Sequence, residues 1–311
     1  MQSRWSETKA REFVEKYGGQ YGAELALRTY SSRLLGAEEA LVLHGGGNTS
    51  VKAPFTNILG ERFPAIFVKA SGFDLAFIEP AGHSGLPLEH LLKLRALQNL
   101  SDDAMLSELR THLLSAHAAT PSIESLAHAF ISEKFIDHTH AGSILALTNQ
   151  PDGEDRSREA LGPDVLVLDY APPGFPLAKA AAAAYDAHPR IKGMVWARHG
   201  LITWGATARQ SYETTVELVS QAEAYLAGRA SHPLIVQVRT PPAAAGERWR
   251  QIAPVLRGLL AMPSAGPDQN CRQVILQRLS TGGVLDLLGS DRGKEIALTP
   301  PLTSDHLIRT K

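Results

Sequence analysis

Apolar residues recur at helical spacing through the first part of the chain. They mark residues 5–17 and then 21–35 as two amphipathic helices. From Ala40 the pattern changes to short apolar runs that glycine, asparagine or serine interrupts, in LVLHGGGNTSVK and then PAIFVKASG. We predict that these runs form paired strands.

The middle of the chain alternates helical and strand-like segments. Residues 88–117 have helical spacing, and Thr120 and Pro121 have the residue types of an N-cap and a first helical position, which puts Glu124 in the first turn of another helix. The remaining pattern predicts strands at 142–148 (GSILALT) and 165–170 (VLVLDY), a helix at 177–189, a strand pair within 193–205 and a helix at 208–226. Such interleaving indicates an α/β layered domain over residues 1–230.

The pattern weakens after this domain. Gly228 and Pro233 mark its expected end, and PPAAAGERW is a predicted linker. Helical segments at 252–260 and 272–287 complete a small C-terminal extension, so that residues 231–311 are predicted to be linker and helical extension.

Composition narrows the classes of function. The 311 residues include 44% hydrophobic and 20% charged residues, and no apolar run is long enough to span a bilayer. Because 31 basic residues face 32 acidic ones, we expect neither nucleic acid nor a membrane as a partner. A single cysteine and an N-terminus without an apolar signal core favour a cytoplasmic protein. Any metal site would use the 12 histidines and the carboxylates.

Three histidines are candidate metal ligands. His138 and His140 lie two residues apart in IDHTHAGSILALT, and on a strand both imidazoles would share one face and reach one ion. His199 precedes Gly200 in WARHGLITWG, where a glycine lets a backbone or ligand approach closely. A histidine pair at a strand entrance and a turn histidine are the alternative interpretations.

Glu124 is a candidate acid or base, since a helix N-terminus favours the charged carboxylate. An ordinary first-turn glutamate is the alternative. His128 lies four residues later on the same helix face, where it either orients the carboxylate or packs.

Small-residue turns are candidate anion sites. Three glycines precede Asn48 and can expose successive N–H groups to a phosphate, although HGGGNTS lacks the spacing of a dinucleotide or P-loop motif. KASG, with Ser71 and Gly72, and the hydroxyl of Ser122 are further candidates, and each is also compatible with a plain turn.

Taken together, these motifs resemble the class II aldolase/adducin-domain family. GGGNTS, KASG, PSIE, HTH and RHG stand in the family's order and at similar spacing over about residues 20–230. The segments GGGNTSVK, PSIES, FIDHTHA and ARHGLITWG are most similar to the aldolase part of bifunctional rhamnulose-1-phosphate aldolase/alcohol dehydrogenase proteins. The resemblance implies a three-layer α/β/α fold with a central mixed, largely antiparallel sheet.

The resemblance also implies roles for the candidate residues. His138, His140 and His199 would bind a divalent metal, with Zn²⁺ expected, and Glu124 would be the catalytic acid/base. The substrate phosphate would lie among Gly47, Asn48, Ser71, Gly72 and Ser122. The implied reaction is reversible, metal-dependent cleavage of a short ketose 1-phosphate, similar to rhamnulose 1-phosphate, to dihydroxyacetone phosphate and an aldehyde. The implied assembly is a homotetramer, and the implied small-molecule partner is a sugar phosphate.

Other activities remain open at this point. Ile123 stands where some relatives have a phosphate-contacting hydroxyl residue, and Ala70 and Phe73 replace a glycine and a serine of the fused proteins. A sugar-phosphate epimerase or dehydratase on the same metal site is one alternative. A non-enzymatic adducin-like interaction module is another, although such a module has no chemical need for the three histidines and Glu124.

Overall fold

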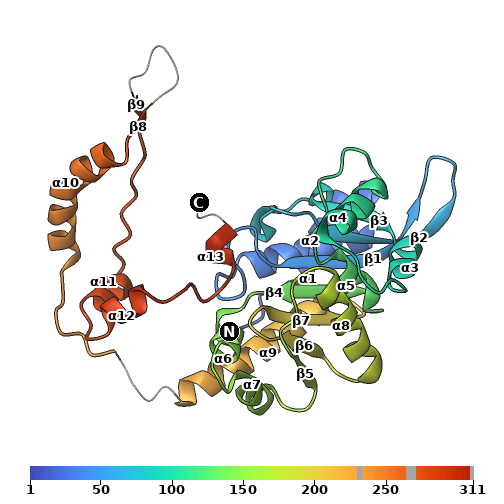
Figure 1. Cartoon of the computed structure of the whole chain (residues 1–311). Coiled ribbons are helices and arrows are strands. Elements are labelled where there is room, and N and C mark those ends of the chain that lie inside the picture. The colour runs from blue at the N-terminus through green and yellow to red at the C-terminus, as the bar shows by residue number, and fades with distance from the viewer. Residues whose placement is uncertain (230–233, 264–270, 309–311) are drawn as a thin grey trace. The chain divides into compact units, whose positions relative to one another are not determined.

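The computed structural model describes residues 1–229, 234–263 and 271–308 (Figure 1). The chain divides into two units, one made of residues 1–229 with the segment that begins at Pro301, the other of the residues between them. The predicted boundary at residue 230 lies outside the described residues. The whole of residues 231–311 was expected to be linker and extension, whereas the segment from Pro301 belongs with the first unit.

A mixed sheet forms the centre of the first unit. Its strands follow the order β3-β2-β1-β4-β7-β6-β5, and every neighbouring pair is antiparallel except β5 with β6. This arrangement confirms the expected mixed, largely antiparallel sheet and places β4 in the middle. The strands are β1 (Asn48–Thr56), β2 (Arg62–Lys69), β3 (His83–Pro87), β4 (Phe135–Thr139), β5 (Val165–Leu168), β6 (Gly193–Trp196) and β7 (Gly200–Gly205).

Helices cover both faces of this sheet (Figure 1). Alternate residues of a strand point to opposite faces, so Trp196 and Ile202 enter a core with α3, α4, α5 and α8, whereas Val195 and Leu201 enter a core with α6, α7 and α9. The result is the expected α/β/α layering. The helices are α1 (Glu7–Tyr21), α2 (Ala23–Gly36), α3 (Leu88–Leu94), α4 (Asp102–Thr111), α5 (Ser125–Phe130), α6 (Gly142–Thr148), α7 (Gly153–Leu161), α8 (Phe175–Ala187) and α9 (Ala208–Arg229).

Several local predictions for the first unit were wrong. The run GSILALT forms helix α6 and not a strand, because a short apolar run fits either element until its neighbours decide which face is buried. Residues 88–117 contain two separate helices, α3 and α4. The predicted strand in LVLHGGGNTSVK begins only at Asn48, after the glycines.

The second unit consists of one long helix, α10, and several short elements. Helix α10 (Pro242–Leu259) includes most of the predicted linker, because a proline in the first turn followed by alanines starts a helix. The helix predicted at 272–287 is confined to α11 (Gly282–Leu288), which α12 (Gly293–Ala297) follows. Strands β8 (Met262–Pro263) and β9 (Cys271–Arg272) pair with each other. Within the described part of the chain, no helix has both the length and the apolar character needed to cross a membrane.

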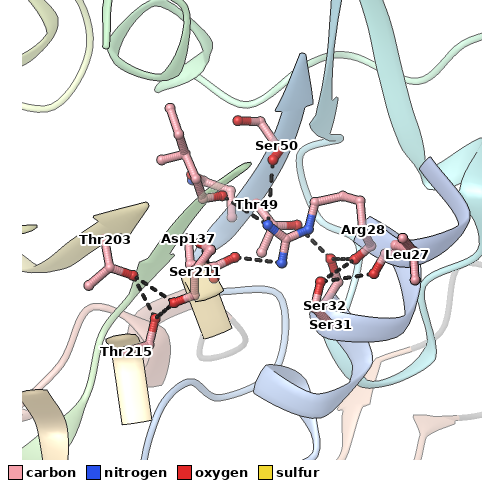
Figure 2. Close-up of polar contacts among 12 residues, drawn as sticks. Leu27, Arg28, Ser31, Ser32, Thr49, Ser50, Asp137, Thr203, Ser211 and Thr215 are labelled. Atoms are coloured by element: carbon pink, nitrogen blue, oxygen red, sulfur yellow. Dashed lines mark hydrogen bonds and ion pairs between the residues drawn. The ribbon is translucent and has the colours of Figure 1, made fainter. Parts of the chain in front are cut away.

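A buried ion pair joins α2 to the middle strand of the sheet (Figure 2). Arg28 Nη2 lies 2.5 Å from Asp137 Oδ1, and both side chains are fully buried. Ser211 of α9 donates to the other oxygen of Asp137 at 2.6 Å, and Arg28 also donates to the carbonyl oxygens of Ser50 and Ile136. Burial lowers the pKa of Arg28 and raises the pKa of Asp137, and the mutual attraction of the two charges opposes both shifts.

Because the two charges are buried together, replacing one of them should lower the free energy of unfolding more than replacing both. Arg28→Met leaves the carboxylate of Asp137 buried without its counter-charge, and we expect a loss of about 3–5 kcal/mol in the free energy of unfolding. Arg28→Met combined with Asp137→Leu removes both charges and should recover much of that loss. Urea unfolding of the wild type and the variants measures both values, and a single variant within about 1 kcal/mol of wild type would contradict the expectation.

Candidate active site

Strand β4 and the turn after it position the first two histidines. His138 has the same parity as Ile136 and so lies on the sheet face opposite Asp137. Its ring is fully buried against Trp196, with 4.7 Å between ring centroids, and its Nδ1 lies 3.1 Å from the carbonyl oxygen of Leu201. His140 follows directly after the strand, and the Nε2 atoms of the two histidines are 3.0 Å apart.

The turn between β6 and β7 supplies the third histidine. Arg198 adopts the left-handed conformation, with φ of 59°, immediately before His199. A Cβ on Gly200 would overlap the carbonyl oxygen of Thr139. This glycine therefore allows strands β4 and β7 to approach each other closely beside the histidines. Candidate ligand atoms of His138, His140 and His199 all lie within 4.8 Å of one another.

The hydrogen bonds of these rings leave ring nitrogens available for a cation. His138 donates from Nδ1 to a carbonyl oxygen, and His140 contacts the carboxylate of Asp305 through Nδ1. In the singly protonated form, either ring would therefore carry its proton on Nδ1 and a lone pair on Nε2. Two lone pairs that face each other repel unless a cation lies beside them, and three imidazoles form a suitable donor set for a divalent metal.

Glu124 completes this cluster, but not from the predicted position. It is the N-cap of α5, one residue before the helix, because Pro121 forms a β-bridge with Ala70 and does not start the helix. Its Oε1 lies 2.9 Å from Nε2 of His199, and its Oε2 lies 3.6 Å from Nε2 of His138. Burial alone would raise the pKa of Glu124, but the neighbouring histidines outweigh that effect and hold the pKa well below its usual value.

A buried hydrogen-bond relay fixes the orientation of Glu124. Ser50 contacts Nδ1 of His128 at 2.8 Å, and Nε2 of His128 lies 2.5 Å from Oδ1 of Asn48. The amide of Asn48 then donates to Glu124. Burial lowers the pKa of His128 to about 3, so the ring is neutral and donates from Nε2. These contacts favour the role of His128 in orienting the carboxylate of Glu124 over a role in packing. The contact runs through Asn48, which the sequence suggested only as a phosphate-binding residue.

The three small-residue turns meet next to Glu124. Lys69 donates to the carbonyl oxygens of Gly45 and Gly47 at 2.6 and 2.9 Å, which holds the glycine loop against β2. Gly47 has φ of 58°, and a Cβ there would lie 2.7 Å from the carbonyl oxygen of His138. The loop thus needs glycine both for its conformation and for its close approach to β4.

The remaining predicted pocket residues lie around this loop. The backbone N–H of Ser71 donates to Thr120 at 2.8 Å, which joins the KASG turn to the segment that carries Ser122. Ser122 accepts from the amide of Asn48 at 3.1 Å. Ser71 and Gly72 are exposed, whereas Gly47, Asn48 and Ser122 are buried. The structure thus gathers the five residues into a small polar region with an open rim.

Sequence similarity decides the family. The family described as Class II Aldolase and Adducin N-terminal domain matches residues 28–226, which include every residue of the site except Asp305. The chain belongs to this family.

Individual relatives agree with this class II aldolase/adducin assignment. The solved N-terminal class II aldolase domain of a conserved Thermoplasma acidophilum protein is 35% identical, with a TM-score of 0.65, over 73% of this chain and 99% of that chain. An aldolase II superfamily protein from Pseudomonas syringae shares the fold at 14% identity, with a TM-score of 0.50, over 79% of this chain and 97% of that chain.

A longer relative matches most of this chain. YuxG of Bacillus subtilis, described as an uncharacterized oxidoreductase, is 29% identical over 286 residues, which are 91% of this chain and 40% of that protein. The chain therefore spans well under half of the length of this relative.

A second cluster with two histidines is less suited to bind a metal ion. His90, Glu108 and His112 are partly exposed and have candidate ligand atoms within 4.8 Å of one another. The two rings stack, however, with centroids 3.5 Å apart and planes inclined by 13°. Because imidazole lone pairs lie in the ring plane, two rings stacked face to face at this distance are poorly oriented to direct both lone pairs at one ion.

The cluster around β4 predicts the effect of removing one imidazole. His140→Ala leaves two imidazoles, an incomplete donor set, and we expect the purified variant to lose most of its divalent ion. Elemental analysis of protein prepared without added metal or a metal-affinity column measures the change. His112→Ala is the matched control and should leave metal content unchanged; equal metal content in His140→Ala and wild type would reject the ligand assignment.

Proposed function

We propose that this chain is a metal-dependent aldolase that reversibly cleaves a short ketose 1-phosphate to dihydroxyacetone phosphate and an aldehyde. The observation that carries the proposal is the convergence of His138, His140 and His199 on Glu124, beside a polar loop region suited to a phosphate. Family membership supports the class of reaction. A substrate similar to rhamnulose 1-phosphate is the leading candidate, on the resemblance of the motifs.

The three histidines and Glu124 together suit a divalent ion, for which we propose Zn²⁺. In His138 and His140 a hydrogen bond holds Nδ1 and leaves Nε2 for a metal. Together with His199 these imidazoles make three zinc ligands, which leave coordination positions open for a substrate. When bound, such an ion is a Lewis acid that polarises a substrate carbonyl group.

Glu124 is positioned to move a proton at carbon. Its anionic form can remove a proton from dihydroxyacetone phosphate in the synthetic direction, and its acid form can protonate the carbanion that C–C cleavage leaves. Asn48 and His199 hold its two oxygens in different directions, which limits rotation of the carboxylate. A role as an additional metal ligand is the alternative for this residue.

The glycine loop and its neighbours are proposed to bind the phosphate. Gly47 and Gly72 can point backbone N–H groups at an anion, and Ser71 and Ser122 offer hydroxyl groups. Lys69 lies beneath this loop, and burial lowers its pKa to about 8 despite the opposing charges of Glu124 and Asp305. Its positive charge favours a phosphate above the loop.

Product analysis distinguishes the aldolase from the alternatives on the same scaffold. An aldolase releases dihydroxyacetone phosphate and an aldehyde from a ketose 1-phosphate, an epimerase returns a stereoisomer, and a dehydratase releases water. A panel that includes rhamnulose 1-phosphate, with chromatographic identification of products, tests the proposed substrate. Size measurement in solution tests the proposed homotetramer.

Glu124→Gln tests the proposed acid/base. The amide keeps the size of the side chain but cannot exchange a proton with carbon, so turnover should fall by about 10²–10⁴-fold while the metal is retained. Exchange of solvent deuterium into dihydroxyacetone phosphate should slow in parallel.

Other results for Glu124→Gln have distinct meanings. Loss of the metal together with activity would identify Glu124 as a metal ligand. Deuterium exchange at the wild-type rate would exclude it as the base. Glu39→Gln, at an exposed position, is the matched control and should leave both measurements unchanged.

Asn48→Ala tests the polar region next to Glu124. If Asn48 contacts the phosphate, KM for the phosphorylated ketose should rise by about tenfold, the loss of one hydrogen bond to a charged group. Because Asn48 also holds Glu124, kcat should fall. His128→Phe removes the orienting hydrogen bond without reaching the substrate and should lower kcat alone. Steady-state kinetics that show an unchanged KM in Asn48→Ala would remove Asn48 from the phosphate pocket.

A further inference from the structure

One buried carboxylate next to the site has no counterpart in the sequence motifs. Asp305 begins the short helix α13 (Asp305–Ile308) and is fully buried, in a segment whose other side chains, apart from Thr303, are mostly exposed. A carboxylate without hydrogen-bond partners is strongly unfavourable in such a place, so its partners show why it is there.

Both oxygens of Asp305 have partners in the first unit. Oδ1 contacts Nδ1 of His140, which is 165 residues earlier in the chain. Oδ2 accepts from the backbone N–H of Leu43 at 2.8 Å, across 262 residues. The carboxylate thus bridges the turn after β4 and the segment before the glycine loop.

The glycine loop is shaped to admit this carboxylate. The three atoms nearest to a Cβ built on Gly46 all belong to the Asp305 carboxyl group, and the Cβ would overlap them. Gly46 is not among the residues with positive φ, so its backbone conformation does not require glycine. The close approach of Asp305 does.

We propose that Asp305 is a positioning residue for the metal ligand His140. Its carboxylate accepts the Nδ1 proton, which fixes the tautomer with a lone pair on Nε2, sets the plane of the ring and increases the basicity of the ligand nitrogen. Asp305 itself is not in place to be a ligand, because it lies at Nδ1, whereas Nε2 of His140 faces His138. The inference rests on the metal site of the proposed function and adds a residue from outside the family match, which ends at residue 226.

A role limited to anchoring the C-terminal segment makes a different prediction. That segment has a second anchor, since Asn149 donates to the carbonyl oxygen of Leu302 at 3.0 Å without contacting His140. Asn149→Ala therefore weakens the anchoring and leaves the contact between Asp305 and His140 intact. If Asp305 acts only as an anchor, Asp305→Asn and Asn149→Ala should have the same effect on the metal.

The test measures metal affinity in the full chain. Competition with a colorimetric chelator should show that Asp305→Asn binds Zn²⁺ about 10–100-fold more weakly than wild type, the usual loss when such a partner of a ligand histidine is removed. Asn149→Ala should bind as wild type does. The visible spectrum of the Co²⁺-loaded protein and the ring nitrogen NMR shifts of His140 should change in Asp305→Asn only, since they report ligand geometry and tautomer.

A double-substitution cycle guards against a general folding defect. Gly46→Ala should weaken Zn²⁺ binding because its methyl group displaces the Asp305 carboxylate. In the Asp305→Ala background this methyl group has room, so Gly46→Ala should produce no further loss in affinity. Additive losses from the two substitutions would show that Gly46 and Asp305 act independently.

Each result separates this inference from the proposed function. A wild type that binds no divalent ion overturns both. A wild type that binds Zn²⁺, with Asp305→Asn binding equally well and an unchanged Co²⁺ spectrum, overturns the inference alone. Equal weakening by Asp305→Asn and Asn149→Ala also overturns it and leaves Asp305 as an anchor.

Discussion

The buried ion pair between Arg28 and Asp137 holds the strand on which the candidate site is built. Strand β4 lies between β1 and β7, and its side chains alternate between the two faces of the sheet. Arg28, the counter-charge of Asp137, lies on one face of the sheet only. A shift of one residue in the register of β4 would turn the Asp137 carboxylate to the other face, into the apolar core that contains Ile136. The pair therefore fixes, at the same time, the face to which His138 and His140 point.

Close approach of backbone segments is the second constraint on the site. Gly47 lies against the carbonyl oxygen of His138, Gly200 against that of Thr139, and Gly46 against Asp305. The absence of side chains at these three glycines lets the glycine loop, strand β4 and the turn between β6 and β7 pack closely together. The polar side chains of the site are therefore held in place by contacts with neighbouring residues. Such a rigid arrangement suits a group of donors that must keep its geometry before any ion or substrate arrives.

Much of this arrangement followed from local sequence patterns. Alternation in FIDHTH was enough to put His138 and His140 on one face, and helical spacing identified α1, α2, α8 and α9. Glu124 was expected inside a helix because Thr120 and Pro121 have capping residue types, but pairing of Pro121 with Ala70 across the fold moves the start of α5. Long-range pairing of that kind leaves no local signal.

The role of Asp305 illustrates the same limit. Nothing near it in the sequence resembles a site, and the domain boundary expected at residue 230 separated it from the histidines. A triple glycine can be explained by positive φ or by phosphate binding. Only the folded structure shows that Gly46 makes room for a side chain from the far end of the chain. The sequence of this segment also gives no hydrophobic signal for burial, because the two residues buried within 301–307, Thr303 and Asp305, are both polar.

The distance in sequence between His140 and Asp305 sets an order of events during synthesis. A ribosome that adds roughly 5–20 residues per second makes the 165 intervening residues in about 8–33 s. Because domains generally fold as units from the N-terminus, the sheet and its three imidazoles can assemble on the nascent chain while Asp305 has yet to be translated. The ring of His140 gains its carboxylate partner only after Asp305 has been synthesised, 165 residues later.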